Sequence, residues 1–246
     1  GLPGLFVAAL MYYTVREPAR KGVEQDLAEI PLKNVLSYLL QRKQAYLGHI
    51  LGISIFIMVV YALNLWGPTY FIRTFEYTRP EAGWVFGLVM ISAGTFGLLT
   101  AGLLSDKLMA RGIHDAYIRM ILFSMLAIMP CAIALGFIEN DKLAIVAMAF
   151  AIYFSAFQGG ISGGALQLMT PNRMRGQVTA LFLLAANLIG LGLGPTVIAM
   201  VTDYIFMDEA AIGKSIALCT LLLCPTGAFI LWRSMPAIQK QLAEQG

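Results

Sequence analysis

Charged residues are scarce in this chain: Asp, Glu, Lys and Arg make up 13% of its 246 residues, whereas hydrophobic residues make up 59%. Soluble domains carry about 25% charged residues, so this composition excludes an ordinary soluble domain and favours a membrane protein. The formal net charge of +3 says little by itself. We expect no nucleic-acid partner.

Residues that bind metals or carry catalysis are also few. The two histidines, His49 and His114, lie far apart at expected helix ends, and no zinc pattern can be built from them. The cysteines lie in apolar runs and are expected to be small buried side chains: Cys131, Cys219 and Cys224. The sequence contains no Gly-x-x-x-x-Gly-Lys-Ser/Thr loop and no Ser-His-Asp or metal set in a loop. We therefore expect no metal, no cofactor, no direct use of ATP and no enzymatic activity.

Apolar runs of membrane length are abundant instead. A helix needs about 20 apolar residues to cross the hydrocarbon core, and a spanning backbone must satisfy its own hydrogen bonds, so each run is expected to be a helix. The predicted spans lie near residues 49–72, 82–105, 118–138, 143–168, 177–202 and 214–233. Short connections favour antiparallel neighbours in one bundle. The prediction is an all-α membrane protein with a six-transmembrane-helix bundle over residues 48–233.

Three further segments surround the predicted bundle. Residues 1–15 begin without an initiator methionine, in an apolar run too short to span, and we interpret them as the truncated end of a transmembrane helix. Residues 16–47 are the long polar stretch, in which Pro31 opens an amphipathic helix. This helix lies either on the membrane surface or against the protein's own face. Residues 234–246 are predicted to be a tail.

The distribution of Lys and Arg predicts the orientation. If residues 16–47 are placed on the cytoplasmic side, most basic residues outside the spans fall on that side. Only Arg73, Arg79, Lys142 and Lys214 remain on the other side. By the positive-inside rule, residues 16–47 and the C-terminus are cytoplasmic, and we expect an integral protein of a bacterial inner membrane.

Two loops carry short motifs. Gly102, Asp106, Lys107 and Arg111 follow a Gly-x-x-x-Asp-Lys pattern with a later basic residue, after the second predicted span. Pro171, Arg173, Arg175 and Gly176 fill the loop before the fifth span. Both loops resemble cytoplasmic motifs of the major facilitator superfamily, although Met109 replaces a later glycine of the first motif. Glu17-Pro18-Ala19-Arg20 is similar to the end of that family's sixth helix, and Asn187 through Asp203 is most similar to its spinster-type subgroup.

The resemblance implies the second half of a twelve-helix transporter, with a missing amino-terminal half and the lipid bilayer as partners. It implies secondary transport of a small organic solute or lipid-like molecule by alternating access. The alternative is a non-transporting membrane sensor or scaffold of the same fold. It also implies that Asp106, Lys107, Arg111, Arg173 and Arg175 form a cytoplasmic gate motif with Gly102, in which Asp106 and Arg175 make a latch.

Uncharged polar residues recur within the predicted spans. They are Ser54, Tyr61 and Asn64 in the first span, Ser155, Gln158 and Ser162 in the fourth, and Asn187 in the fifth. Polar groups are costly in lipid unless they face protein or a water-filled cavity. They either bond between helices or line a substrate cavity, and the resemblance, in which the seventh and tenth helices line the cavity, favours the second. No span has a charge at its centre, so a coupling residue lies in the missing half or does not exist.

Two Gly-Pro pairs are hinge candidates. Gly67 and Pro68 are expected to interrupt the first span near its outer end, and Gly194 and Pro195 to bend the fifth. Trp66 and Tyr70 are expected in the interfacial aromatic belt. Glycines four apart, including Gly83 with Gly87 and Gly190 with Gly194, predict close approach of helices.

Overall fold

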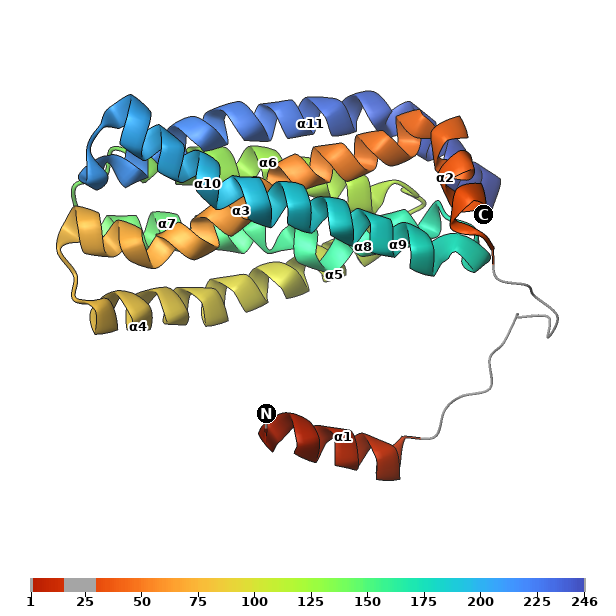
Figure 1. The fold of residues 1–246 in the computed structure, drawn as a ribbon, viewed down its shortest axis with the longest axis horizontal. Coiled ribbons are helices and arrows are strands. Elements are labelled where there is room, and N and C mark those ends of the chain that lie inside the picture. Colours follow the sequence, from red (N-terminus) through yellow and green to blue (C-terminus); the bar gives the residue numbers. More distant parts are fainter. Residues whose placement is uncertain (1, 16–29, 246) are drawn as a thin grey trace. The chain divides into compact units, whose positions relative to one another are not determined.

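The computed structural model of the protein describes residues 2–15 and 30–245. The chain forms two units, Gly1–Pro31 and Leu32–Gly246 (Figure 1). The first unit contains α1 (Leu2–Thr14), a 13-residue apolar helix that is too short to cross a membrane. The motif at Glu17–Arg20 lies outside the described residues, as do the basic residues Arg16, Arg20 and Lys21.

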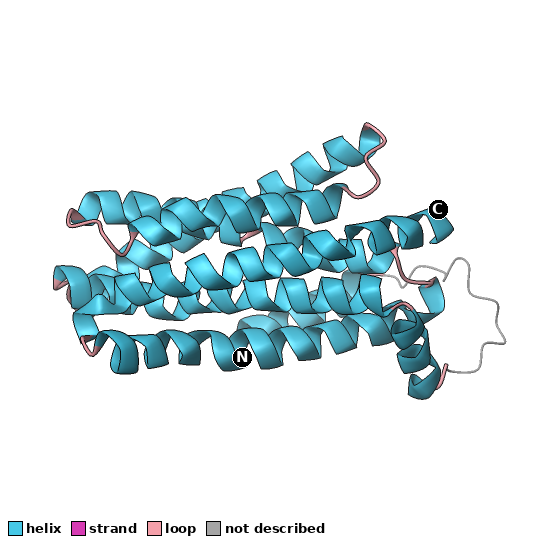
Figure 2. Ribbon diagram, turned by 90° about the horizontal axis from the view of Figure 1, so that it is seen from above, coloured by secondary structure: helices cyan, strands magenta, loops and turns pink. Residues whose placement is uncertain are grey.

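The second unit is a bundle of long apolar helices, which confirms the predicted fold class (Figure 2). Six segments are long and apolar enough to span a membrane: Lys43–Phe75, Arg79–Ala110, Ala116–Ala134, Asp141–Leu168, Asn172–Phe206 and Glu209–Glu244. A seventh helix, α2 (Leu32–Gln41), precedes them. The described residues are helical apart from short turns.

Several spans consist of more than one helical segment. The first is α3 (Lys43–Phe75) and the third is α6 (Ala116–Ala134). The second joins α4 (Arg79–Val89), η1 (Met90–Gly94) and α5 (Thr95–Ala110), and the fourth joins α7 (Asp141–Ser155) and α8 (Phe157–Leu168). The fifth runs through η2 (Asn172–Met174), α9 (Arg175–Ala185), η3 (Ala186–Leu191), α10 (Gly192–Met200) and η4 (Val201–Phe206). The sixth is η5 (Glu209–Ala211) with α11 (Ile212–Gln245).

Most helices extend beyond the predicted apolar runs. Helix α5 continues past residue 105 to Ala110, and α11 continues through Pro236 to Gln245, so the predicted tail is helical. The apolar run marks only the part of a helix that needs lipid, because polar residues are tolerated in a helix that projects beyond the hydrocarbon core. Hydropathy therefore predicts the number of spans better than it predicts their ends.

Helix α3 forms the centre of the bundle and packs along α11 and against η3 and α10. Glycines make these approaches possible. A Cβ atom on Gly52 would lie 3.0 Å from the Gly227 carbonyl oxygen, and one on Gly194 would lie 2.5 Å from the Met58 carbonyl oxygen. The close approach predicted for Gly190 and Gly194 is therefore present. The one predicted for Gly83 and Gly87 is not, because no described atom lies within 4 Å of either Cβ position.

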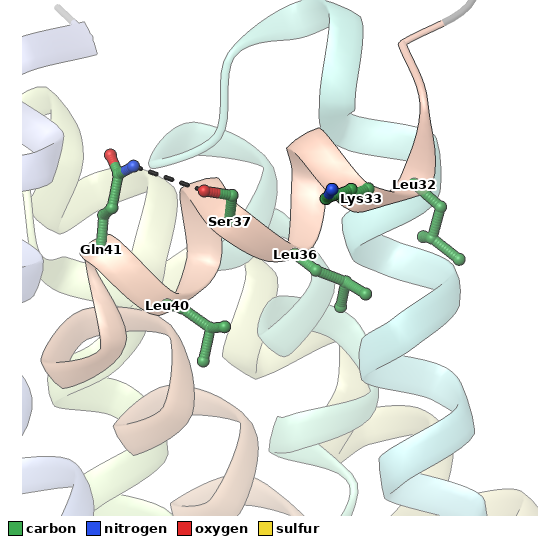
Figure 3. Close-up of a pocket in the computed structure, with 6 residues that line it drawn as sticks. All are labelled: Leu32, Lys33, Leu36, Ser37, Leu40 and Gln41. Atoms are coloured by element: carbon green, nitrogen blue, oxygen red, sulfur yellow. Dashed lines mark hydrogen bonds between the residues drawn. The ribbon is translucent and has the colours of Figure 1, made fainter.

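Helix α2 packs on the bundle, which is one of the two positions expected for the amphipathic helix. Val35 and Leu39 are buried, so one face packs on the bundle. Leu32, Leu36 and Leu40 are exposed and point to one side of the helix, away from Ser37 and Gln41 (Figure 3). These leucines line an open groove together with Lys33. One apolar face of α2 is thus left for a lipid surface or another protein.

Candidate functional site

The structure brings two predicted polar residues together from distant parts of the sequence. Tyr61 on α3 donates a hydrogen bond to the side-chain oxygen of Asn187 in η3, with an O–O distance of 3.4 Å. The Asn187 amide nitrogen donates to the Leu183 carbonyl at 2.8 Å, which orients the side chain. Gly190 permits this contact between helices, because a Cβ there would lie 2.4 Å from Ile57. The pair lies on an exposed part of the bundle.

The helical segment that holds Asn187 is a π-helix. Its i→i+5 bonding inserts an extra residue into the helix, and such segments are frequent at functional sites. A second π-helix, η4, lies on the other side of Pro195 in the same span. Neither segment was predicted, because a local change of helical repeat leaves no clear trace in hydropathy. The π-helix sets the direction of Asn187 in the fifth span.

Asn64 lies one turn from Tyr61 on α3, and its side-chain oxygen is buried without a hydrogen-bond partner among the described residues. Pro68 also lacks the N–H that would bond to the Asn64 carbonyl four residues earlier. A buried acceptor without a partner costs about 1–3 kcal/mol, so Asn64 is a position where a ligand donor would be favourable.

The two predicted hinges contact each other through Trp66. Its indole nitrogen donates to the Pro195 carbonyl at 3.0 Å, so Trp66 bonds within the bundle. The predicted interruption at Gly67 and Pro68 is wrong, because α3 runs unbroken from Lys43 to Phe75. Gly67 instead makes room for Phe86 of α4, whose ring would lie 2.2 Å from a Cβ. A hinge role for Gly67, Pro68, Gly194 and Pro195 stays a prediction.

The fourth span places its polar residues differently. Ser155 and Ser162 are buried, and the Ser155 hydroxyl donates to the Ile152 carbonyl at 2.8 Å in its own helix. Ser54 on α3 is also fully buried. Gln158 follows the junction of α7 and α8 and is half-buried. Among the predicted residues, Tyr61, Gln158 and Asn187 therefore reach the surface of the bundle. Asn64 is half-buried with its side-chain oxygen enclosed, and the three serines lie within the packing.

The motif after the second span lies within a helix. Asp106 and Lys107 belong to α5, which ends at Ala110, so the predicted placement of Asp106 beyond the helix end is wrong. The helix continues because exposed polar residues do not interrupt it. The turn begins at Arg111 and contains Gly112, whose φ of 84° is unfavourable for other residues. Gly102 has open space around its Cβ position.

The predicted Asp106–Arg175 latch is absent from this conformation. Asp106 accepts a hydrogen bond from the Tyr117 hydroxyl at 3.0 Å. Arg175 donates through Nε to the Thr170 carbonyl at 3.0 Å. The ion pairs of the described residues join Arg73 to Glu209 and Arg119 to Asp115. Arg173 lies on η2, beside Arg175 at the start of α9. A latch in another conformation stays a prediction.

Asp115 is a buried acid that the sequence prediction missed. One of its oxygens accepts from Arg119 Nε at 2.8 Å, and the other accepts from Gln239 Nε2 at 2.8 Å. Burial raises the pKa of Asp115, but hydrogen bonds from Arg119 and Gln239 outweigh this effect and the pKa is lowered. Asp115 ties the start of α6 to the last turns of α11. The sequence signal that would have pointed to Asp115 is an acid just before an apolar run with Arg four residues later, which is typical of a helix start.

His49 lies within α3 and not at a helix end as predicted. Its ring is fully buried, 5.9 Å from the ring of Phe182. The prediction failed because α3 begins six residues before His49, beyond the apolar run.

The Major Facilitator Superfamily model matches residues 1–195 of the chain. Among curated proteins, an MFS-type efflux pump of Mycolicibacterium smegmatis is 26% identical over 211 residues. The match covers 84% of this chain and 48% of the pump, so the chain spans about half the length of that relative.

The fold is similar to crystal structures of a bacterial homologue of the human lysosomal transporter Spinster. The inward-facing, unoccupied structure gives a TM-score of 0.60 at 18% identity, covering 99% of this chain and 58% of that one. The inward-facing, occupied structure gives 0.56 at 18% identity, covering 99% and 56%. At this identity the likeness shows the fold alone.

Proposed function

Because the chain belongs to the major facilitator superfamily, we propose that it forms the carboxy-terminal half of a secondary transporter. The transporter moves a small organic solute or lipid-like molecule across a membrane by alternating access, one half rocking against the other around a site near the middle of the membrane. Six membrane-length spans and the half-length match to a relative support this proposal.

The gathering of Tyr61, Asn64 and Asn187 carries the proposal. These uncharged polar residues come from two spans and are not fully buried. Polar groups within a membrane are retained where they face protein or a water-filled cavity, because contact with hydrocarbon is costly. The surface around Tyr61 and Asn187 is therefore the side of the bundle that faces the path of the solute.

The fourth span adds a further half-buried amide, Gln158. Amides and a phenol each offer donors and acceptors without a charge's burial cost, so they suit hydroxyl, amide or carbonyl groups of a solute. The surrounding spans are apolar and would contact the apolar part of the solute. This combination favours an uncharged or weakly polar amphiphile, with any ion-coupling residue supplied by the other half.

The end of the bundle that carries α2, the α5–α6 turn and the C-terminus is proposed to be cytoplasmic. Lys33, Arg42, Lys107 and Arg111 lie at this end, as the positive-inside rule requires. The exposed leucines of α2 then lie at the inner membrane surface. Asp106 and Arg175 lie at the same end, where a latch between them would close the cytoplasmic side.

Transport by the full-length protein in membrane vesicles tests the proposal. The probes are Nile red, ethidium and a fluorescent lysophospholipid, which differ in charge and in apolar content. Asn187→Ala is expected to weaken apparent affinity for the transported probe by about threefold to tenfold, the effect of losing one neutral hydrogen bond. Thr226→Ala is the control, because its exposed hydroxyl bonds only to its own helix at Leu222.

One result would contradict transport, and another would contradict the assigned solute path. Correctly inserted protein that moves no probe in either direction, together with binding of a probe, would favour the sensor or scaffold. Equal affinity in Asn187→Ala and Thr226→Ala would remove the Tyr61–Asn187 surface from the solute path while leaving transport itself intact.

A further inference from the structure

A cavity of about 730 Å³ opens at the end of the bundle that carries the α5–α6 turn. Its polar lining comes from three places: His114, Asp115 and Arg119 around the start of α6, Arg175 at the start of α9, and Gln239 near the end of α11. Small-molecule sites have volumes of about 300–1,000 Å³, so this loop-end cavity is large enough for a ligand.

The hydrogen bonds within the loop-end cavity occupy both oxygens of its acid but only one nitrogen of each arginine. Asp115 is the one acid among the lining residues, and its two oxygens are taken by Arg119 and Gln239. Arg119 makes this bond through Nε, so its two Nη groups have no partner among the described residues. Arg175 is likewise held through Nε by the Thr170 carbonyl. Two oriented guanidinium groups therefore face one cavity with free N–H donors.

This arrangement is suited to an anion with several oxygens. A guanidinium offers a planar fork of donors that matches phosphate or carboxylate, and a fork already held in place loses less freedom on binding. The lining holds two arginines and one ionised acid, Asp115, so its net charge is positive. His114 adds a further polar group. Phosphate has more acceptor oxygens than a carboxylate, so it has enough acceptors for both forks.

The remaining lining is apolar: Met109, Ile113, Leu168 and Leu242. A bare inorganic ion would leave these side chains without contact. We propose that the loop-end cavity binds a phosphate-bearing amphiphile, with Arg119 and Arg175 on the phosphate and the apolar side chains against its organic part. A phospholipid headgroup and a soluble organic phosphate share this chemistry.

The loop-end cavity is separate from the proposed solute surface. Arg175 and Asn187 belong to the same span, and at a rise of about 1.5 Å per residue they lie about 18 Å apart along its axis. A ligand there would connect the start of α6, the start of α9 and the end of α11, which the Asp115–Gln239 bond already joins in part. The inference does not depend on transport, because binding is measured directly.

The test is a binding titration with full-length protein in detergent at constant ionic strength. The probes are dihexanoyl phosphatidic acid, inorganic phosphate, and dihexanoylglycerol as the phosphate-free control. Arg119→Gln and Arg175→Gln are expected to weaken phosphatidic acid binding about tenfold or more, because each removes a charge-assisted hydrogen bond. Arg233→Gln, an exposed arginine on α11 outside the cavity, should bind as the native protein does.

Arg119→Lys keeps the charge beside Asp115 but loses the fork, so it should give an intermediate affinity and provides a folded variant if Arg119→Gln does not fold. Binding of phosphatidic acid with weak or no binding of inorganic phosphate supports an amphiphilic ligand held by both its phosphate and its organic part. Inorganic phosphate that binds as tightly as phosphatidic acid would overturn the amphiphile, because the apolar lining would then contribute nothing. The proposal is overturned if the native protein binds neither probe saturably. It is also overturned if Arg119→Lys and Arg175→Gln both bind like Arg233→Gln.

Discussion

The first and second spans are similarly apolar, with mean hydropathies of 2.1 and 1.8, but they occupy opposite environments. In the most apolar part of each, 67% of the first span is buried within the bundle and only 17% of the second. Helix α3 lies in the middle of the bundle, whereas α4 lies at its edge (Figure 1). Hydropathy does not separate the two, because lipid is as apolar as a protein interior.

The surroundings of the glycines distinguish the two spans in part. Glycines of α3 are in contact: a Cβ on Gly48 would overlap Ser234, and one on Gly67 would meet Phe86. Glycines of the second span are mixed: Gly97 packs against the Tyr153 backbone, whereas Gly83, Gly87 and Gly102 have open space at their Cβ positions. The first set is explained by packing within this bundle. The open glycines leave a smooth surface that, under the proposed function, the amino-terminal half would cover.

The largest effect is expected where a glycine touches backbone. Gly194→Ala would place its Cβ 2.5 Å from the Met58 carbonyl oxygen, which cannot move without shifting α3. We expect a loss of about 1–3 kcal/mol in the free energy of unfolding, typical of overpacking. Thermal unfolding of the purified protein measures it. Gly192→Ala is the matched control, because its Cβ would make an ordinary 3.8 Å contact, and equal stability of the two variants would contradict the close approach.

Substitution of the open glycines of the second span should have the opposite effect: stability stays the same and contact with the other half weakens. Gly83→Leu with Gly87→Leu is expected to leave unfolding of this chain within about 0.5 kcal/mol, as for surface positions. It should nevertheless reduce co-purification with a separately expressed amino-terminal half. If co-purification is unchanged, the open glycines face lipid and another surface of the bundle contacts that half.

The difference between the two spans also explains what could be predicted from the sequence. Apolar length is a local property, so six spans were predicted near their observed places. The partners of polar residues are not local: Tyr61 meets Asn187, and Asp115 meets Gln239, across more than 100 residues. Nothing in the sequence around Asp115 indicates that its partner lies on α11. The resemblance to a family favoured a substrate cavity lined by polar residues, which stays a prediction, and it did not indicate that Ser54, Ser155 and Ser162 are buried within the packing.

A smaller effect is expected at Asp115 and depends on pH. Its pKa is lowered in the folded protein, so the carboxylate stabilises the fold above its unfolded value of about 3.9 and loses that contribution as pH falls through and below it. The free energy of unfolding should therefore fall between about pH 5 and pH 3 more steeply in the native protein than in Asp115→Asn. Asp203→Asn, an exposed acid, should retain the native slope. Equal slopes in the native protein and Asp115→Asn would contradict the role of the Arg119 and Gln239 bonds.

The smallest effect on stability is expected from removing the Tyr61–Asn187 hydrogen bond. Gly194 offers a direct comparison, because it packs at the same interface but is expected to have the largest effect. The two sites are neighbours on the same interface between α3 and the fifth span, but the hydrogen bond is long at 3.4 Å and lies at an exposed position. Hydrogen bonds between membrane helices average about 0.6 kcal/mol, because the separated helices also find partners for their polar groups.

A double-mutant cycle of Tyr61→Phe and Asn187→Ala should give a coupling energy of about 0.6 kcal/mol or less in unfolding experiments. Both single variants should alter apparent solute affinity more than they alter stability, since their polar groups are available to a ligand. A coupling energy above about 1.5 kcal/mol with unchanged solute affinity would make the pair a packing contact like Gly194, and the solute path would then have to follow another face of the bundle.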